Sequence, residues 1–263
     1  MNDTLTVFIL SVLQGVAEFL PISSSGHLVL GKHLLGLESP GARLEIALHV
    51  GTLFSVMAFY RERIIGLIKG MFAGCKESWW MVGNIMISTI PAVIFYVLCH
   101  KAVDETFEST RFVGAALVFT GVVLCAMQWF SRKVKDGEVT LPRAVAVGIA
   151  QAVAILPGIS RSGMTISMAR ITGVAPEKAA EFSFLMSMPL IAGAVLKDAL
   201  FSESAEVAQV GVSFGLLLAG AIIAGIVGYF SLMWLVRLLR GQHFWMFGVY
   251  CLIAGCLSLL FLR

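Results

Sequence analysis

The chain alternates long apolar segments with short polar ones, and the first apolar segment is broken in its middle. Apolar residues run through 5–20, where Pro21 cannot continue a helix interior, and a second apolar stretch follows at 23–35. Each piece is shorter than the roughly 20 residues that a membrane-spanning helix needs. Residues 4–36 therefore predict a re-entrant helical hairpin whose Pro-Ser turn lies at membrane depth inside protein.

The second half of the chain repeats this pattern. Residues 141–172 form another broken apolar segment, interrupted at Pro157 and Gly158. Three uninterrupted apolar segments follow each hairpin, and their lengths predict transmembrane helices at about 44–60, 81–99, 112–130, 179–196, 212–235 and 244–262. The predicted fold class is an all-α polytopic membrane protein, with a single membrane domain over 1–263, a first repeat at 1–135 and a second at 136–263.

The repeats are predicted to have opposite orientations. Each contains one re-entrant hairpin plus three transmembrane helices, and an odd number of crossings places the second repeat upside down, which makes an inverted-topology repeat. The loops within 61–76, 132–143, 170–178 and 237–240 hold twelve Lys and Arg residues, whereas those at the opposite ends of the helices hold six. The positive-inside rule assigns the first set to the cytoplasm. The first hairpin then opens outward and the second inward.

Composition agrees with membrane insertion and excludes other classes. The chain is 58% hydrophobic and 13% charged, with a mean hydropathy of +0.90, which is far too apolar for a soluble domain of 263 residues. The net charge is only +3 and no basic run indicates a nucleic-acid partner. Five scattered cysteines predict neither a disulfide framework nor a zinc site.

The two broken segments share a sequence. Residues 14–27 read QGVAEFLPISSSGH and residues 151–164 read QAVAILPGISRSGM, with seven identities in a gapless comparison. Glu18 and His27 stand opposite apolar residues, and Ser24 stands opposite Arg161. One half therefore supplies a carboxylate and the other a guanidinium.

The first broken segment carries the candidate chemistry. Gln14 and Glu18 are four apart, so on a helix they share one face and offer oxygen ligands to one hard cation or a path for one proton. Ionisable groups at membrane depth are costly and usually functional. The serines at 23–25 begin the next helix, whose N-terminus favours an anion such as phosphate. His27 follows within the first turn, close enough to exchange a proton with a bound group or a serine.

The second segment offers a similar helix start with a cation. Arg161 lies within the run Ser160-Arg161-Ser162-Gly163, and Thr165 follows. If the repeat is inverted, two positive helix ends and a guanidinium converge near the midplane, an arrangement that suits a multiply charged anion.

Two of the predicted transmembrane helices also carry polar residues. Glu45, His49 and Thr52 recur on one face of the first, a pattern typical of a helix that lines a cavity. Two roles stay open for them, direct contact with a ligand or support of the residues that make it. Ser183 and Ser187 in 179–196 are expected to hydrogen-bond between helices.

These motifs resemble a known family. The pair Gln14-xxx-Glu18, the PISSSGH that follows and PGISRSGMT at 157–165 are similar to the signature of the undecaprenyl-diphosphate phosphatase family, also known as bacitracin-resistance proteins. The resemblance covers essentially the whole chain. It implies a multi-pass enzyme of the bacterial cytoplasmic (inner) membrane, with its active site facing the periplasmic side. Such enzymes hydrolyse undecaprenyl diphosphate to undecaprenyl phosphate, which recycles the lipid carrier of peptidoglycan synthesis and confers bacitracin resistance.

The resemblance also implies roles for residues. Glu18, Ser24, His27 and Arg161 match catalytic positions. Substrate-binding positions are matched by Ser23, Ser25, Gly26, Ser160, Ser162 and Thr165. The implied divalent cation, Mg²⁺ or Ca²⁺, would be held by Gln14 and Glu18, although many members have Glu where this chain has Gln14, a weaker ligand that cannot act as a base.

Several alternatives stay open at this point. The nucleophile is either Ser24 or a metal-activated water. The implied partners are a polyprenyl diphosphate lipid and the bilayer, without nucleic acid, and a homodimer is an open alternative. A different class of function, a polyprenyl-phosphate flippase or transporter, could use the same midplane anion site, because many secondary carriers are built from inverted repeats with broken helices.

Overall fold

The computed structural model describes residues 3–35, 42–131, 136–201, 213–240 and 243–262, without the side chains at 3, 35, 42 and 197–201. Within these residues the regular elements are all helices, and one isolated bridge joins Gly137 to Val174. The prediction of an all-α membrane protein is confirmed at this level. The predicted repeat boundary at 135/136, the end of the first hairpin at 36 and the start of the span at 212 lie outside the described residues.

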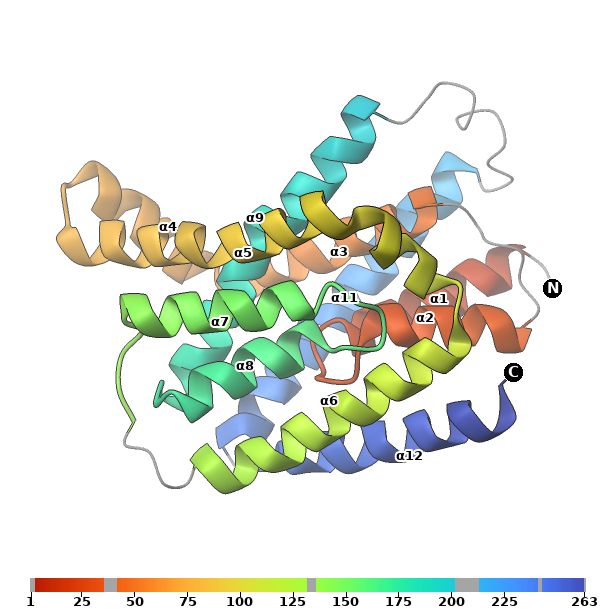
Figure 1. Ribbon diagram of the computed structural model, residues 1–263. Coiled ribbons are helices and arrows are strands. Elements are labelled where there is room, and N and C mark those ends of the chain that lie inside the picture. Colours follow the sequence, from red (N-terminus) through yellow and green to blue (C-terminus); the bar gives the residue numbers. More distant parts are fainter. Residues whose placement is uncertain (1–2, 36–41, 132–135, 202–212, 241–242, 263) are drawn as a thin grey trace.

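The described helices follow in chain order (Figure 1). They are α1 (Asp3–Ala17), α2 (Ser24–Leu35), α3 (Ala42–Phe59), α4 (Arg61–Phe72), α5 (Lys76–Phe107), α6 (Thr110–Ser131), α7 (Leu141–Val153), α8 (Arg161–Ile171), α9 (Pro176–Phe201), α11 (Phe214–Arg240) and α12 (Trp245–Phe261). We call α1 and α2 with their connection the first hairpin, and α7 and α8 with theirs the second hairpin. The tips are residues 18–23 and 154–160.

Not every predicted span is equally long. Among the described residues, α5, α6, α9 and α11 are long and apolar enough to cross a membrane. The helix α12 has 17 residues, or about 25 Å at 1.5 Å per residue, and α3 has 18 residues that include Glu45 and His49. The six predicted segments are therefore all helical, and four of them have the length and composition of a span.

The prediction missed part of the region between α3 and α6. The helix α4 was not expected, and α5 extends beyond the predicted 81–99 at both ends. The reason is that α4 mixes charged and apolar residues, with Leu67 as its buried side chain, so it contains no continuous apolar run. The added turns of α5 are polar, and helical backbone hydrogen bonds continue through them regardless of hydropathy.

The hairpins break close to the predicted positions. The helices α1 and α7 end at Ala17 and Val153, each four residues before a proline, because proline has no N–H to donate to the carbonyl four residues earlier. The first helix is thus shorter than the predicted 5–20. Ser23 and Gly158 have φ of 70° and 89°, and these left-handed residues reverse the chain at each tip.

The two tips lie directly against each other. A Cβ added to Gly26, in the first turn of α2, would lie 2.8 Å from the Cα of Gly158 in the second tip. A Cβ added to Gly163, in the first turn of α8, would lie 3.3 Å from the Cβ of Pro21 in the first tip. Each tip therefore packs on the start of the other hairpin's second helix.

The most extensive helix contacts join the two halves of the chain. The helices α6 and α12, α3 and α11, α5 and α7, and α1 and α11 pack against each other (Figure 1). Every one of these pairs combines a helix before residue 132 with one after residue 136. The aromatic side chains of Phe19 and Phe184 are fully buried and meet edge to face with ring centroids 5.6 Å apart, next to the tips.

Candidate active site

Both tips end in a serine that caps the following helix. The Ser23 hydroxyl oxygen accepts a hydrogen bond from Gly26 N at 3.2 Å, and that of Ser160 accepts from Gly163 N at 3.1 Å. Serine is among the preferred residues at this position because its oxygen satisfies a backbone N–H that has no helical partner. The first helical residue after each cap is then Ser24 in one hairpin and Arg161 in the other.

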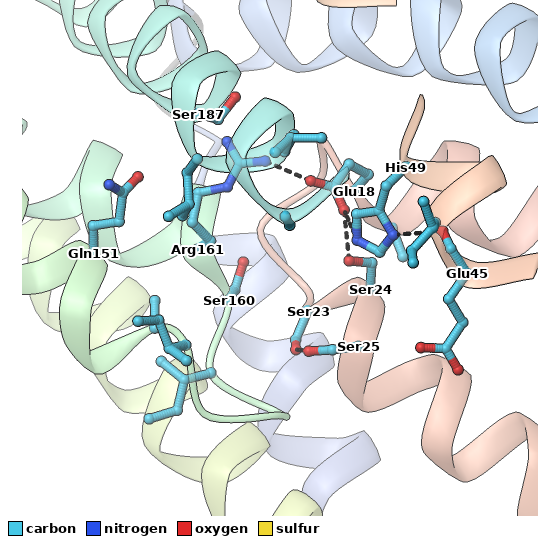
Figure 2. Close-up of a pocket in the computed structure, with 18 of the residues that line it drawn as sticks. Glu18, Ser23, Ser24, Ser25, Glu45, His49, Gln151, Ser160, Arg161 and Ser187 are labelled. Carbon is cyan, nitrogen blue, oxygen red and sulfur yellow. Dashed lines mark hydrogen bonds and ion pairs between the residues drawn. The ribbon is translucent and has the colours of Figure 1, made fainter. Parts of the chain in front are cut away.

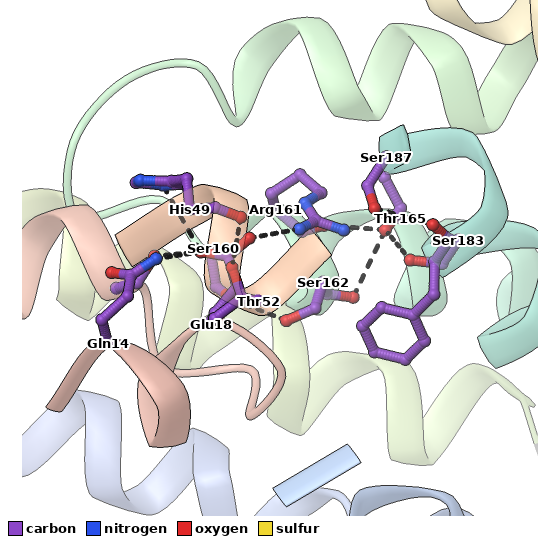
Figure 3. A network of polar contacts seen from close by, with 12 residues as sticks. Gln14, Glu18, His49, Thr52, Ser160, Arg161, Ser162, Thr165, Ser183 and Ser187 are labelled. Carbon is purple, nitrogen blue, oxygen red and sulfur yellow. Dashed lines mark hydrogen bonds and ion pairs between the residues drawn. The ribbon is translucent and has the colours of Figure 1, made fainter. Parts of the chain in front are cut away.

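Glu18 lies at the centre of the site (Figure 3). Its Oε1 accepts from Arg161 Nη2 at 2.5 Å. Its Oε2 accepts from the Ser24 hydroxyl at 2.7 Å and from Gln14 Nε2 at 3.0 Å. The Glu18 N–H donates to the Gln14 carbonyl at 2.9 Å, so the predicted helical spacing of these two residues is present although α1 ends one residue earlier. The structure thus brings Gln14, Glu18, Ser24 and Arg161 together.

The ion pair between Glu18 and Arg161 is largely buried. Their side chains are 7% and 15% exposed. A buried charge without a partner is strongly unfavourable, so each group makes the burial of the other tolerable. Arg161 Nη1 is buried and has no hydrogen-bond partner among the described residues, and the guanidinium carbon lies 6.0 Å from the centroid of the Phe184 ring.

A histidine from α3 completes this cluster. His49 Nε2 lies 3.6 Å from Glu18 Oε2, and His49 Nδ1 donates to the Glu45 carbonyl at 2.8 Å. The Thr52 hydroxyl donates to the His49 carbonyl at 2.9 Å. Of the three residues in the predicted polar stripe, His49 is therefore the one that contacts the central carboxylate. Glu45 forms an ion pair with Lys32 instead.

His27 does not join the cluster. Its Nδ1 donates to the Ser23 carbonyl at 2.9 Å, and its Nε2 lies 2.7 Å from the Tyr250 hydroxyl of α12. The two rings stack with centroids 5.6 Å apart. The structure therefore places His27 between the first tip and α12.

A cavity of about 350 Å³ lies beside the cluster, between the hairpins (Figure 2). Glu18, Ser24 and Arg161 line it, as do three of the predicted substrate-binding residues, Ser23, Ser25 and Ser160. Part of its wall is apolar and comes from α9 and the second tip: Ala154, Ile155, Ile159, Leu190, Ile191, Ala194 and Val195.

The other three predicted substrate-binding residues are buried and do not line this cavity. Gly26 lies against Gly158. The Ser162 hydroxyl donates to the Leu20 carbonyl at 3.4 Å, and the hydroxyls of Thr165 and Ser183 are 2.6 Å apart. This last contact joins α8 to α9, which confirms the expected helix–helix hydrogen bond of Ser183. Ser187 bonds within its own helix, to the Phe184 carbonyl.

Gln151 and Ser187 also line the cavity, and sequence reasoning had given neither of them a role in the site. The signal for Gln151 was its match to Gln14 in the shared sequence. A second cavity, of about 820 Å³, adjoins the first and shares Ser25, Glu45, His49 and Ile155 with it. Lys32, Asp104 and Glu108 line the second cavity and not the first.

The donors for a metal are few. No group of three or more His, Cys, Asp or Glu side chains suited to a metal occurs in the described part of the chain. Gln14 Oε1 is, however, fully buried without a hydrogen-bond partner among the described residues, next to the Glu18 carboxylate. Of the two expected cations, Mg²⁺ suits this pair better, because Mg²⁺ is often held by one or two protein oxygens together with substrate phosphates and water.

The arrangement has the parts of a nucleophilic phosphoryl-transfer site. A hydroxyl donates directly to a carboxylate, as a nucleophile does to its base. A guanidinium and two helix N-termini lie beside the same cavity and can bind phosphate oxygens.

The chain is similar to known proteins over nearly its whole length. Residues 7–257 match the model of a family described as bacitracin resistance protein BacA. An undecaprenyl-diphosphatase of Methanosphaera stadtmanae is 36% identical, covering 99% of this chain and 98% of that protein. One from Desulfatibacillum aliphaticivorans is 39% identical, covering 95% and 96%. Undecaprenyl-diphosphatase 2 of Bacillus thuringiensis is 34% identical, covering 98% and 97%.

Proposed function

The chain belongs to the bacitracin resistance protein BacA family, and we propose that it hydrolyses undecaprenyl diphosphate to undecaprenyl phosphate and phosphate in the cavity between its hairpin tips. Its family makes it a phosphatase, and its long apolar helices make it a membrane protein. The observation that carries the location of the reaction is the hydrogen bond from Ser24 to Glu18, with Arg161 on the other carboxylate oxygen.

The contacts support Ser24 as the nucleophile. Glu18 Oε2 accepts the Ser24 proton as the oxygen attacks the terminal phosphorus. A bond forms between this oxygen and phosphorus, the bond to the bridging oxygen breaks, and its electron pair stays on the lipid phosphate. Water then attacks the phosphoserine, which releases phosphate and restores the hydroxyl. Arg161 and the helix N-termini stabilise the charge that develops during both steps.

We assign the proton-transferring imidazole to His49 rather than His27. His49 Nε2 is 3.6 Å from the Glu18 oxygen that receives the serine proton, a distance that a small side-chain movement closes. His27 has both ring nitrogens engaged with Ser23 and Tyr250, so its role is to hold the first tip against α12.

Gln14 and Glu18 are the residues that would hold a divalent cation. Glu18 lines the cavity and is hydrogen-bonded to the Gln14 amide, and the unpartnered Gln14 Oε1 supports this assignment. A bound cation would neutralise phosphate charge and orient the diphosphate. With Gln14 in place of a carboxylate, Glu18 is both a ligand and the base.

The contacts between the tips support the inverted-topology repeat, each half with one re-entrant hairpin and three transmembrane helices. The gapless comparison pairs Gly26 with Gly163 and Pro21 with Gly158. A two-fold rotation that exchanges the repeats therefore converts the contact of Gly26 with Gly158 into that of Gly163 with Pro21. The packing of α1 on α11 and of α7 on α5 exchanges in the same way. The proposed division at 135/136 falls between α6 and α7.

The distribution of charge supports an assignment of the membrane side. The excess of Lys and Arg within 61–76, 132–143, 170–178 and 237–240 supports a cytoplasmic position for these segments. The first hairpin, with Ser24 and Glu18, then opens to the periplasmic side of a bacterial inner membrane. A homodimer stays a prediction without support from any contact described above.

Phosphate release from undecaprenyl diphosphate by the purified protein in detergent tests this function. We expect release that EDTA lowers and that Glu18→Ala and Arg161→Ala abolish. Labelled phosphate trapped on Ser24 separates the serine from a metal-activated water as nucleophile. Detergent leaves no second compartment, so transport cannot contribute to the signal, and a flippase without phosphatase activity would release no phosphate. Well-folded protein that releases no phosphate would refute the proposal.

A further inference from the structure

Gln151 is a polar side chain of the cavity that the reaction above does not use. It is fully buried, and neither its Nε2 nor its Oε1 has a hydrogen-bond partner among the described residues. A buried amide without partners is unfavourable, because its polar atoms have lost their bonds to water and gained none in the protein. Gln151 lines the cavity next to Arg161 (Figure 2). Arg161 Nη1 likewise has no hydrogen-bond partner among the described residues. Both groups are therefore available to a ligand in this space.

We propose that Gln151 and Arg161 Nη1 bind the phosphate that stays on the prenyl chain, and that they hold the lipid monophosphate as the leaving group. This inference rests on the proposed function, which it extends by fixing the orientation of the substrate. A diphosphate presents two phosphate groups, and the terminal one must face Ser24.

The guanidinium of Arg161 divides the site into two sides. Its Nη2 is bound to Glu18, on the side that carries Ser24 and His49. Figure 2 shows Gln151 on the opposite side of Arg161 from Glu18. A planar guanidinium can donate to two groups through its two ends. The terminal phosphate therefore meets Nη2 and the lipid phosphate meets Nη1 and Gln151.

The apolar wall of the cavity agrees with this orientation. Ala154 and Ile155 follow Gln151 by three and four residues, and Leu190, Ile191, Ala194 and Val195 of α9 line the same cavity. The first isoprene units of the substrate need such a surface directly beside the phosphate that carries them. Polar groups that bind phosphate and apolar groups that bind a hydrocarbon thus lie next to each other on the side of Gln151.

The amide has a chemical role in this position. When the bond to the terminal phosphorus breaks, the electron pair moves to the bridging oxygen, and the negative charge of the lipid phosphate increases. The N–H groups of Gln151 and of Arg161 Nη1 stabilise this charge as it develops. The apolar wall holds the prenyl chain and so directs its phosphate to the side of Gln151, whereas inorganic phosphate has no chain to direct it there.

Binding of two probes to the full-length protein in detergent tests the inference: farnesyl monophosphate, which has a phosphate with an attached prenyl chain, and inorganic phosphate. Titration calorimetry measures the affinity of wild type and of Gln151→Met for each probe. Methionine has about the length of glutamine but lacks the polar atoms of the amide. We expect farnesyl monophosphate to bind about tenfold more weakly to Gln151→Met, the loss of one hydrogen bond to a charged group. Affinity for inorganic phosphate should stay within about twofold.

Two further variants keep the test decisive. Gln151→Glu retains the shape of the side chain and adds a charge that repels phosphate, so it should weaken farnesyl monophosphate binding further, and it replaces Gln151→Met if that protein does not fold. Asn84→Leu is the matched control, because Asn84 of α5 is another buried amide with an unpartnered nitrogen, outside the residues that line the cavity. It should bind both probes as wild type does.

Two outcomes would overturn the inference. Wild-type affinity of both Gln151 variants for farnesyl monophosphate would show that the amide does not contact the lipid phosphate. An equal loss for both probes would show that it acts only on the general structure of the site. If wild type hydrolyses no undecaprenyl diphosphate but still binds farnesyl monophosphate through Gln151, the proposed function and the leaving-group role fail together, and only the binding of a prenyl phosphate at Gln151 stands.

Discussion

At the residue scale, the three serines of the first tip differ in what their hydroxyls contact. Ser23 caps α2, and Ser25 lies 3.3 Å from the Ser23 oxygen. Ser24 donates to Glu18, which makes it the serine whose proton has an acceptor ready. Three adjacent residues of one type therefore have distinct chemical roles, and substitution separates them.

Replacing Ser24 should remove the reaction rather than weaken binding. We expect Ser24→Ala to lower kcat by about 10³-fold or more, because nucleophile and base then no longer form a pair. Ser25→Ala is the control and should keep kcat within about tenfold, since its hydroxyl contacts the capping serine instead of Glu18. Initial rates of phosphate release measure both. Wild-type rates in Ser24→Ala would shift the reaction to a metal-activated water.

The two histidines should be distinguishable by substitution. In His49→Gln we expect a loss of about 10²-fold in kcat, because the imidazole beside Glu18 transfers protons. His27→Gln should lower kcat less, because His27 positions the tip. Tyr250→Phe removes the other half of that contact and should resemble His27→Gln. Initial rates of phosphate release measure all three variants, and a larger loss in His27→Gln than in His49→Gln would return the proton-transfer role to His27.

At the element scale, the site depends on how closely the two hairpin tips approach. Glu18 and Ser24 come from the first hairpin and Arg161 from the second, so a shift of one tip changes every distance in the cluster. Glycines permit the approach at Gly26, where a Cβ would lie 2.8 Å from the Gly158 Cα, and at Gly158, whose φ of 89° disfavours other residues.

Gly26→Ala should therefore separate the tips while leaving the helices intact. We expect a fall in kcat of about 10²-fold, which is typical when reacting groups are misplaced by about 1 Å. Gly83→Ala in α5 is the matched control, since a Cβ there meets nothing within 4 Å, and it should be active as wild type. Circular dichroism in detergent checks that helix content is unchanged. Full activity in Gly26→Ala would mean that the tips can separate without affecting the reaction.

The elements also show which parts of the structure the sequence could predict. Proline and clustered polar residues interrupt an apolar run, so both hairpins and the residues at their tips were predictable. The amphipathic α4 was not, because its apolar residues are not continuous. The roles of His27 and His49 could not be separated either. His27 is close to Ser24 in sequence, but its side chain points back to the Ser23 carbonyl, and only packing of α3 on the tips places His49 beside Glu18.

At the scale of the whole molecule, the two halves depend on each other. The most extensive contacts, α6 with α12, α3 with α11, α5 with α7 and α1 with α11, all cross from one half to the other. This interleaving could not be predicted from the hydropathy pattern, which gives the helices but not their neighbours. The shared sequence at 14–27 and 151–164 indicated only that the two tips are related.

Neither half should fold alone. We expect residues 1–135 or 136–263 expressed separately to be degraded or aggregated in the membrane, because each exposes the helix faces that the other covers. Co-expression of the two pieces should give a complex that co-purifies and retains phosphatase activity, since the cut falls between α6 and α7. Stable, monodisperse protein from a single half would contradict this interdependence.

The ion pair between Glu18 and Arg161 has a consequence for inhibitors. Because the two groups neutralise each other, a head group can replace either partner. A phosphonate on a prenyl-like chain would compete with Glu18 for the guanidinium, as we propose for the substrate. An amidine on the same chain would compete with Arg161 for the carboxylate and cover the oxygen that Ser24 needs. Cationic lipids of this kind resemble neither the substrate nor the product, and they would form a separate class of antibiotic leads.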